Sequence, residues 1–321
     1  MRWRSTLLPV VFLLSLLPLM TRGATNSGFK ICSYKVQKFN KAKASNFRLM
    51  HSLTKIVSRY DITVLQDVMD PAVIKSLLAA LNSQADRYEE FTYESVSSKS
   101  LGNSPDSMQQ YVFVYRTQTV NVSGQFQYDK KQAFVRNPFA VEFQSKKTAI
   151  KKFVLVAFLA EPKQAVQEMN RLYDVFLAVS KNFDNRHVMF VGDFHAGCAY
   201  MTRQDKKKIK LFTNTSFSWL IGDKMDTTST EETHCPYDRM VVFGEPFLKG
   251  IVPFSGKVVN IARDFKLTMS KVRDLSSNLP LEVYLKGSAP LLKATAPLLK
   301  ATPLLILASA SVIVQSFLSA L

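Results

Sequence analysis

The sequence predicts an α/β protein with β-sheet at its centre. Apolar, β-rich runs alternate along the chain with segments whose apolar residues recur at helical spacing. The length of 321 residues and the hydrophobic content of 47% suffice for the core of one large domain. Residues 83–110 and 120–152 lack helical signals and suit hairpins and surface loops, so we expect the sheets to be mixed.

Each predicted element follows from its local pattern. The predicted strands are Phe29–Val36, Asp61–Val68, Tyr111–Tyr115, Phe153–Leu159 and Val188–Val191. The predicted helices are Phe47–Tyr60, Pro71–Leu81 and Ala165–Val179. The last of these is the clearest, because its apolar residues share one face. Pro71 suits the first turn of its helix, where a missing N–H costs nothing.

The N-terminal residues 1–24 have the pattern of a secretory signal peptide. Arg2 and Arg4 precede an apolar run that ends near the small residues Gly23 and Ala24. The apolar run is short for a membrane span, so we expect cleavage near Ala24. An uncleaved membrane helix is the alternative.

The C-terminal residues 287–321 resemble a lipid-anchor (GPI) signal. Small residues at 287–289 precede a duplicated heptapeptide, at 289–295 and 296–302, and an uncharged, mostly apolar tail. No basic residue follows the tail, which argues against an ordinary stop-transfer helix. A true membrane helix and a tail of little consequence are the alternatives.

The charge balance is strongly basic. The net charge of the whole chain is +17. The N-terminal segment carries three arginines, the tail carries two lysines and neither carries an acid, so the remaining body keeps about +12 of this charge. Such a body attracts polyanions such as DNA. A solvated basic surface without a specific ligand accounts for the charge equally well.

Cysteine count and glycosylation motifs agree with a secretory route. Three cysteines in a secreted chain indicate one disulfide and one leftover thiol. Asn121 and Asn214 each begin an acceptor triplet for N-glycosylation. With the signal pattern, these features predict an extracellular or cell-surface protein.

Acidic residues recur beside apolar strands. Asp67, Asp193 and Asp238 are predicted to fall just after such strands, and Gln109 stands just ahead of another. Oxygen ligands gathered at strand ends suit a divalent cation such as magnesium or calcium, which can neutralise a phosphodiester. A single aspartate at a strand end is more commonly a cap or turn residue.

Two segments make the chain similar to the deoxyribonuclease I family, within the endonuclease/exonuclease/phosphatase superfamily. They are Val191–Tyr200 and Thr233–Val242, and shorter matches follow in family order between Phe29 and Lys286. The resemblance implies a single domain at 25–286, built as a sandwich of two mixed β-sheets with helices on the outer faces. The tail resembles that of the membrane-associated branch, and we expect a monomer.

The resemblance also implies a disulfide between Cys198 and Cys235, with Cys32 left over and buried. Several site positions match the family. Asp193 and Asp238 match family aspartates, and Arg136 matches an arginine that contacts DNA. Asp226 and Thr228 fall in a loop that resembles a structural calcium site of the family.

Other family positions are altered. Asp67 stands where the family has a metal-binding glutamate, so a metal could bind only in a shifted position. Lys35 replaces an asparagine, and a lysine there would repel a cation and add phosphate affinity. His195 also replaces an asparagine, either as a substitute base or soft-metal ligand, or as a tolerated polar replacement. These two changes alter the expected substrate-binding surface.

The proton-transfer groups of the family are missing. Leu159 and Asn278 stand where the family has its two histidines, and Gln109 and Ser277 replace the supporting acids. One hypothesis is therefore a secreted or anchored protein that binds DNA or another polyanion with little hydrolysis. The alternative is an active, divalent-metal-dependent endonuclease with a rewired site that uses Asp67, Asp193, Asp238 and His195.

Overall fold

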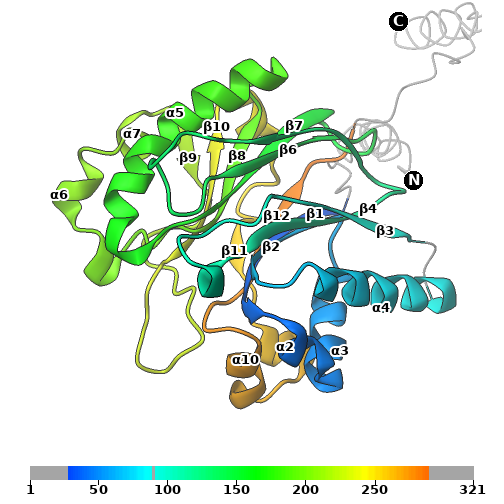
Figure 1. Cartoon of the computed structure of the whole chain (residues 1–321). Helices are drawn as coiled ribbons and strands as arrows, with labels where there is room; N and C mark the ends of the chain where they lie inside the picture. The colour runs from blue at the N-terminus through cyan, green and yellow to red at the C-terminus, as the bar shows by residue number, and fades with distance from the viewer. Residues whose placement is uncertain (1–27, 89–90, 289–321) are drawn as a thin grey trace, which may run out of the picture. The chain divides into compact units, whose positions relative to one another are not determined.

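The computed structural model describes residues 28–88 and 91–288, which belong to one compact unit. Figure 1 shows two sheets lying face to face with helices outside them. Within these residues each sheet has six strands, in the orders β11-β12-β1-β2-β4-β3 and β5-β6-β7-β8-β10-β9. The predicted sandwich of two mixed sheets is confirmed.

The first sheet joins strands from both ends of the described chain. Its members are β1 (Phe29–Phe39), β2 (Ile62–Val68), β3 (Tyr93–Ser97), β4 (Gln110–Arg116), β11 (Lys257–Val258) and β12 (Leu281–Leu285). Strand β1 runs parallel to β2 and antiparallel to β12, which makes the sheet mixed. Strand β2 is buried along nearly its whole length, whereas β1 alternates apolar residues with polar ones such as Lys30 and Lys35 that are only partly buried.

The second sheet carries the strands nearest the candidate site. Its members are β5 (Asn121–Gln127), β6 (Phe139–Gln144), β7 (Lys152–Leu159), β8 (Val188–Asp193), β9 (Phe217–Trp219) and β10 (Asp238–Phe243). Strand β7 is parallel to β8, and β10 is antiparallel to β8. Helix α5 makes the β7-to-β8 crossover and covers this sheet's outer face.

The helices are α2 (Lys41–Ser45), α3 (Phe47–Val57), α4 (Ala72–Tyr88), α5 (Ala165–Phe183), α6 (Arg203–Lys206), α7 (Lys210–Thr213), α8 (Glu245–Lys249), α9 (Ile261–Phe265) and α10 (Met269–Leu275), with single 3₁₀ turns at Pro105–Ser107, Pro162–Gln164 and Cys198–Tyr200. The longer helices α3, α4 and α5 pack on the outer faces through apolar stripes, whereas short helices such as α2 and α6 bury no residue. In α3, Leu53, Ile56 and Val57 are buried, and the side chain of Asn46 caps the first turn.

Helix α4 is longer than its sequence pattern predicts. The apolar spacing indicates an end near Leu81, whereas the helix continues to Tyr88. The Asn82 side chain holds this region against β3, because its Oδ1 accepts the Tyr93 N–H at 2.8 Å and its Nδ2 donates to the Tyr93 carbonyl at 3.2 Å. A tertiary contact therefore supports a segment that periodicity alone leaves out.

The main core lies between the two sheets. It includes Phe113 of β4, Phe143 of β6 and Phe153 of β7, whose rings pack at centroid distances of 5.9 to 6.0 Å. Two further buried clusters lie between each sheet and its helices. Burial of this kind supplies most of the free energy that holds the strand ends in place.

The predicted terminal segments lie outside the described residues. These are the signal peptide at 1–24 and almost all of the 287–321 segment, of which only Gly287 and Ser288 are described. Within the described part of the chain, no helix is both long enough and apolar enough to cross a membrane.

Candidate functional site

The candidate site forms where β8 ends and β10 begins. The two strands are antiparallel, and their register places Asp238 directly opposite Asp193. The prediction that Asp238 follows a strand is wrong, because this residue opens β10. The antiparallel direction brings the start of one strand to the end of the other, so both carboxyl groups still meet. Gly192 permits the close packing here, since a Cβ would lie 2.0 Å from the Phe158 carbonyl oxygen.

The buried Asp193 carboxylate has donors on both oxygens. Its Oδ2 accepts from Lys35 Nζ at 2.9 Å and from Asn278 Nδ2 at 3.3 Å. Its Oδ1 accepts the backbone N–H of His195 at 3.1 Å. The His195 Nδ1 also lies 2.9 Å from Oδ1, at an ion-pair distance but without the alignment of a hydrogen bond. Burial acts to raise the pKa of Asp193, but Lys35 and His195 outweigh it and hold this pKa well below its usual range.

Asp238 is buried beside Asp193 and has the opposite shift. Burial first, and then the neighbouring Asp193 charge, raise the pKa of Asp238 well above its usual range. Asn278 Nδ2 donates to Asp238 Oδ2 at 2.6 Å, so one amide group spans both carboxyl groups. The Asn278 backbone is fixed by a bridge to Thr228.

Lys35 supplies the positive charge of this cluster. Burial acts to lower its pKa, but Asp193, Asp238 and Asp67 outweigh burial, and the pKa of Lys35 is raised. One ammonium balances one carboxylate, which agrees with Asp193 being ionised while Asp238 favours its proton. A divalent cation would need both carboxylates ionised and would face the ammonium. The residues present therefore do not fit a divalent metal, and no group of three or more His, Cys, Asp or Glu suited to a metal occurs in the described ranges.

Asp67 lies close enough to Lys35 to influence its pKa, but its carboxylate is bonded to the backbone of β1. Its φ of 62° marks an irregularity in the β1–β2 ladder, and its Oδ2 accepts the backbone N–H of Lys38 at 3.0 Å. No hydrogen bond joins its carboxylate to Asp193 or Asp238 in the described structure. Burial is the first cause of its raised pKa.

Leu159 ends β7 directly beside Asp193 in the parallel ladder. Its side chain is buried, and its backbone N–H donates to the Tyr111 hydroxyl at 3.0 Å. Gln109 pairs with Leu101 in an isolated bridge, and its buried Oε1 accepts no hydrogen bond from a described residue. Neither residue is connected by a hydrogen bond to the carboxyl pair.

Arg136 is buried, and its guanidinium is bonded inside the protein through Nε and Nη2. Its Nε donates to the Leu159 carbonyl at 3.3 Å, and its Nη2 donates to the Ala160 carbonyl at 3.1 Å. The same Nη2 pairs with Glu161 Oε2 at 3.0 Å. This guanidinium therefore fixes the end of β7, a role that its sequence motif did not indicate.

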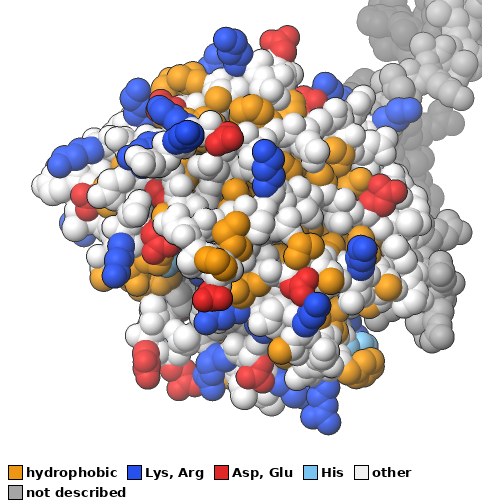
Figure 2. Space-filling model, in the orientation of Figure 1, with side chains coloured by type: hydrophobic (Ala, Val, Ile, Leu, Met, Phe, Trp, Pro, Cys, Tyr) orange, Lys and Arg blue, Asp and Glu red, His pale blue; other side chains and the backbone are white. Residues whose placement is uncertain are grey.

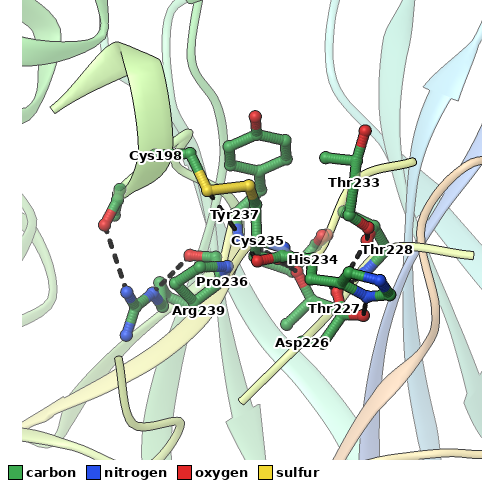
Figure 3. Close-up of a disulfide and its surroundings, with 12 residues drawn as sticks. Cys198, Asp226, Thr227, Thr228, Thr233, His234, Cys235, Pro236, Tyr237 and Arg239 are labelled. Atoms are coloured by element: carbon green, nitrogen blue, oxygen red, sulfur yellow. Dashed lines mark hydrogen bonds and ion pairs between the residues drawn. A yellow bond between two sulfur atoms is a disulfide. The ribbon is translucent and has the colours of Figure 1, made fainter. Parts of the chain in front are cut away.

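The disulfide predicted from the resemblance is confirmed between Cys198 and Cys235, whose Cα atoms are 5.9 Å apart. Figure 3 shows it beside the loop that leads into β10. Cys32 is free and buried, as expected.

The Asp226 carboxylate organises this loop from within. Its Oδ1 accepts from the Thr228 N–H at 2.9 Å and the Cys235 N–H at 3.1 Å, and its Oδ2 lies 2.8 Å from His234 Nδ1 (Figure 3). The Thr228 hydroxyl also donates to Asp226 Oδ1 at 2.6 Å. Calcium at Asp226 and Thr228 stays a prediction, and it would have to compete with these donors.

Two residues that support the carboxyl pair were not predicted from the sequence. Thr227 is buried, and its Oγ1 accepts the N–H groups of Tyr237 and Asp238 at 3.0 and 3.1 Å. Gln66 Oε1 accepts the Asp193 N–H at 3.2 Å. A lone threonine or glutamine gives no signal in the sequence, because its partners are distant or belong to the backbone.

His195 is held between two tyrosine rings. Its ring stacks on Tyr237 at a centroid distance of 4.9 Å and meets the edge of Tyr200 at 4.8 Å. The residue has a φ of 48°, which the loop after β8 imposes. These contacts fix the imidazole beside Asp193.

Comparison with known proteins identifies the family. The chain is 34% identical over 266 residues to human deoxyribonuclease gamma, covering 81% of this chain and 86% of that protein. It is 36% identical over 283 residues to rat deoxyribonuclease-1, covering 85% and 96%. The chain belongs to the deoxyribonuclease I family. No family model matches it.

Solved structures of lower identity support the fold of this deoxyribonuclease I family member. An endonuclease/exonuclease/phosphatase family protein from Leptotrichia buccalis aligns with a TM-score of 0.58 and 11% identity, covering 80% of this chain and 99% of that one. The human nocturnin catalytic domain aligns with a TM-score of 0.56 and 10% identity, covering 81% and 94%. At these identities the likeness concerns the fold alone.

Proposed function

We propose that this deoxyribonuclease I family member binds DNA or another polyanion and hydrolyses it little or not at all. The observation that carries the proposal is the 2.9 Å contact between Lys35 Nζ and Asp193 Oδ2. The chain itself supplies a cation to the carboxyl pair, and Asn278 spans that pair. With Lys35 balancing Asp193 and Asp238 favouring its proton, the cluster has no net negative charge to repel a polyanion and needs no metal ion to neutralise it.

The altered proton-transfer positions support the same proposal. The Leu159 side chain can neither donate nor accept a proton, and an asparagine such as Asn278 does not titrate at neutral pH. One general acid or base contributes roughly a hundredfold to ten-thousandfold in rate. Loss of both groups would leave hydrolysis slower by several orders of magnitude.

Surface charge supports polyanion binding. Lysines and arginines exceed acidic residues by 17 in the chain. Figure 2 shows basic side chains spread over one face with acidic ones between them. Long-range attraction to phosphates follows from this excess, and it carries no sequence preference.

The terminal segments support secretion and attachment to the cell surface. We propose cleavage of residues 1–24, a lipid anchor added within the 287–321 segment, N-glycosylation at Asn121 and Asn214, and a monomeric domain between the terminal segments. Release of the protein from intact cells by a phospholipase specific for lipid anchors tests the attachment. Retention after that treatment would contradict it.

An active, metal-dependent nuclease is the second candidate. The observation in its favour is His195, whose Nδ1 lies 2.9 Å from Asp193 in a ring-stacked, fixed position. A histidine beside an ionised carboxylate has the composition of a general base. On this candidate, a divalent ion would have to displace Lys35 from Asp193.

Plasmid cleavage separates the two candidates. The purified chain, incubated with magnesium, calcium or manganese, should leave the plasmid uncut even at high protein concentration. A matched variant carries Leu159→His, Asn278→His and Gln109→Glu, and a second adds Lys35→Asn to these. We expect cutting to appear only when Lys35→Asn accompanies the restored groups.

Metal-dependent cutting by the unaltered chain, abolished by Asp238→Ala, would overturn the proposal. When the plasmid stays uncut, slower migration of the DNA in a gel tests separately whether the chain binds DNA. A chain that neither cuts nor retains DNA would contradict the nuclease candidate and the DNA-binding form of the proposal.

A further inference from the structure

A second surface, remote from the candidate site, combines lysines with an exposed aromatic side chain. We call it the basic–aromatic corner and define it as residues 145–151, 245–256 and 284–288. Backbone hydrogen bonds join the three segments: Ala149 N–H donates to the Lys286 carbonyl at 2.8 Å, and Lys286 N–H donates to the Gly250 carbonyl at 2.8 Å. A further bridge links Thr148 to Gly287. The corner is therefore one connected surface.

The charge of the corner is strongly positive. It contains the lysines 146, 147, 151, 249 and 286 and a single acid, Glu245. Glu245 pairs with Lys249 at 2.8 Å within α8. Within the described ranges, Lys146, Lys147 and Lys286 have no ion-pair partner among the salt bridges found. These ammonium groups are available to anionic groups outside the protein.

Phe254 projects from a turn that is fixed by hydrogen bonds. Its side chain is 102% exposed, and its φ is 58°, a conformation that costs a non-glycine residue about 1 kcal/mol or more. The following Ser255 pins the turn, because its Oγ donates to the Val252 carbonyl at 2.7 Å and accepts the Tyr284 N–H at 3.1 Å. The aromatic ring is thus held outward by a built turn.

Apolar surface continues around this ring. Leu248 is 37% exposed, and a surface pocket of about 430 Å³ lies between α8, the 251–256 segment and the end of β9. Its lining includes Trp219, Leu248, Pro253, Phe254 and Lys286. An aromatic ring and a leucine ringed by lysines suit the boundary between lipid headgroups and acyl chains, where lysines extend toward phosphates.

The corner and the candidate site lie at opposite ends of the same strands. Strand β7 runs from Lys152, next to the corner, to Leu159, which lies beside Asp193. Strand β12 runs from Leu281, on the Asn278 side, to Leu285, which precedes Lys286, and Figure 1 shows this orange strand leading away from α10. Strands of five to eight residues separate the two ends by about 20 Å.

We propose that the basic–aromatic corner contacts the headgroup layer of a lipid bilayer, with Phe254 inserted and the lysines on lipid phosphates. This contact would turn the candidate site away from the membrane, toward polyanions in solution. Ser288, from which the proposed anchor segment continues, lies in the corner, where Ser288 N–H donates to the Lys147 carbonyl at 2.9 Å. The inference rests on the proposed surface attachment.

Two tryptophan variants of the chain, released from cells by the phospholipase specific for lipid anchors, test the orientation. Phe254→Trp places a reporter in the corner, and Phe47→Trp places a matched reporter on α3, where Phe47 is 80% exposed. After loss of residues 1–24, Trp219 is the native tryptophan, and its signal is subtracted using the unaltered chain. With phosphatidylserine–phosphatidylcholine vesicles, Phe254→Trp emission should shift to the blue and be quenched by brominated lipids, while Phe47→Trp should show neither change.

Charge reversal tests the lysines. The triple change Lys146→Glu, Lys147→Glu and Lys286→Glu should weaken binding to these vesicles by roughly a hundredfold or more, because each basic residue near an anionic surface contributes about 1 kcal/mol and every 1.4 kcal/mol is tenfold. Its matched control reverses Lys207, Lys208 and Lys224, which are exposed and also have no ion-pair partner in the described ranges, and this control should bind the vesicles as the unaltered chain does.

Equal responses of the two tryptophan variants to vesicles would overturn this proposal. A Phe254→Trp response to duplex DNA but not to vesicles would also overturn it, in favour of a polyanion at the corner. Neither result bears on plasmid cleavage, so failure here is distinguishable from failure of the proposed function.

Discussion

Lys35 provides the positive charge that the two buried carboxyl groups of the site require. Its side chain is 16% exposed, so its ion pair with Asp193 is only slightly screened by water. Where the resemblance implies an asparagine among metal ligands, this chain has an ammonium group. This single substitution gives the carboxyl pair an ammonium group of the chain as its cation.

Replacing Lys35 with asparagine should lower the free energy of unfolding by about 3 kcal/mol, because breaking a buried ion pair leaves Asp193 uncompensated. Magnesium should restore part of this loss in the variant and leave the unaltered chain unchanged. Urea unfolding with and without magnesium measures both effects. The control is Lys41→Asn, whose partner Asp70 lies 3.6 Å away and whose side chain is 79% exposed, so less than about 1 kcal/mol should be lost. Equal stability of Lys35→Asn and Lys41→Asn would contradict this prediction.

Asp238 should make stability depend on pH. Its folded-state pKa is raised by burial and by Asp193, so its contribution is fully present below the unfolded pKa of about 3.9 and is lost as pH rises through the folded pKa. Asp238→Asn removes this titration. The unfolding free energy of the variant relative to the unaltered chain should therefore increase as pH rises from about 4 toward the folded pKa. Urea titrations across this range check the sign, and a flat or falling difference would refute it.

At the scale of elements, short links fix the strand ends that form the site. The buried guanidinium of Arg136 ties the loop after β5 to the end of β7, and the Cys198–Cys235 disulfide ties the loop after β8 to the entry of β10. The strands themselves are held by apolar burial. Their polar ends need these specific links, because exposed loops have few apolar contacts.

Arg136→Ala should destabilise the domain by about 2–3 kcal/mol, since it leaves two carbonyl groups and Glu161 without their donor. Arg136→Lys should recover little, because one ammonium cannot reproduce the planar fork. Thermal and urea unfolding measure the change, with exposed Arg203→Ala as the control. Unchanged stability together with weaker DNA retention would instead support the direct DNA contact that the resemblance implies.

Removing the disulfide as the pair Cys198→Ala and Cys235→Ala should cost about 4 kcal/mol by the loop-entropy relation. The relation applies because the two cysteines are 37 residues apart in sequence. Unfolding of the pair variant is compared with that of the unaltered chain under non-reducing conditions. A loss below about 1 kcal/mol would show that the crosslink adds little to the 198–235 region.

At the scale of the whole molecule, the described domain carries its two proposed functional regions at opposite ends of the same strands. The carboxyl cluster lies at one end of β7 and β12, and the basic–aromatic corner lies at the other. The excess of basic residues should attract polyanions at long range, and the proposed binding then depends on local geometry.

DNA binding should weaken steeply with salt. Raising sodium chloride from about 50 to 200 mM should reduce DNA affinity by at least about tenfold, because each phosphate contact releases bound counterions. Fluorescence anisotropy with a labelled duplex measures the slope, with and without magnesium. An affinity that is independent of salt, or that requires magnesium, would contradict metal-independent electrostatic binding.

Much of the fold and part of the site could be predicted from the sequence. Strands such as β7 and β8 were found within a residue or two, because their buried apolar runs reflect their own local pattern. The length of α4 was not predicted, because it depends on the contact of the Asn82 side chain with β3. The position of Asp238 at the start of β10 was not predicted either, because it depends on the antiparallel register of β10 with β8.

The sequence by itself determined the family, the alternation of strands and helices, the basic charge and the identity of every altered site residue. Composition and spacing are local properties that a chain carries before it folds. Only the tertiary structure decided that Lys35 contacts Asp193, that Asn278 spans both carboxyl groups and that Arg136 is turned inward. Those outcomes depend on distances between residues separated by up to 158 positions, which packing of the two sheets sets.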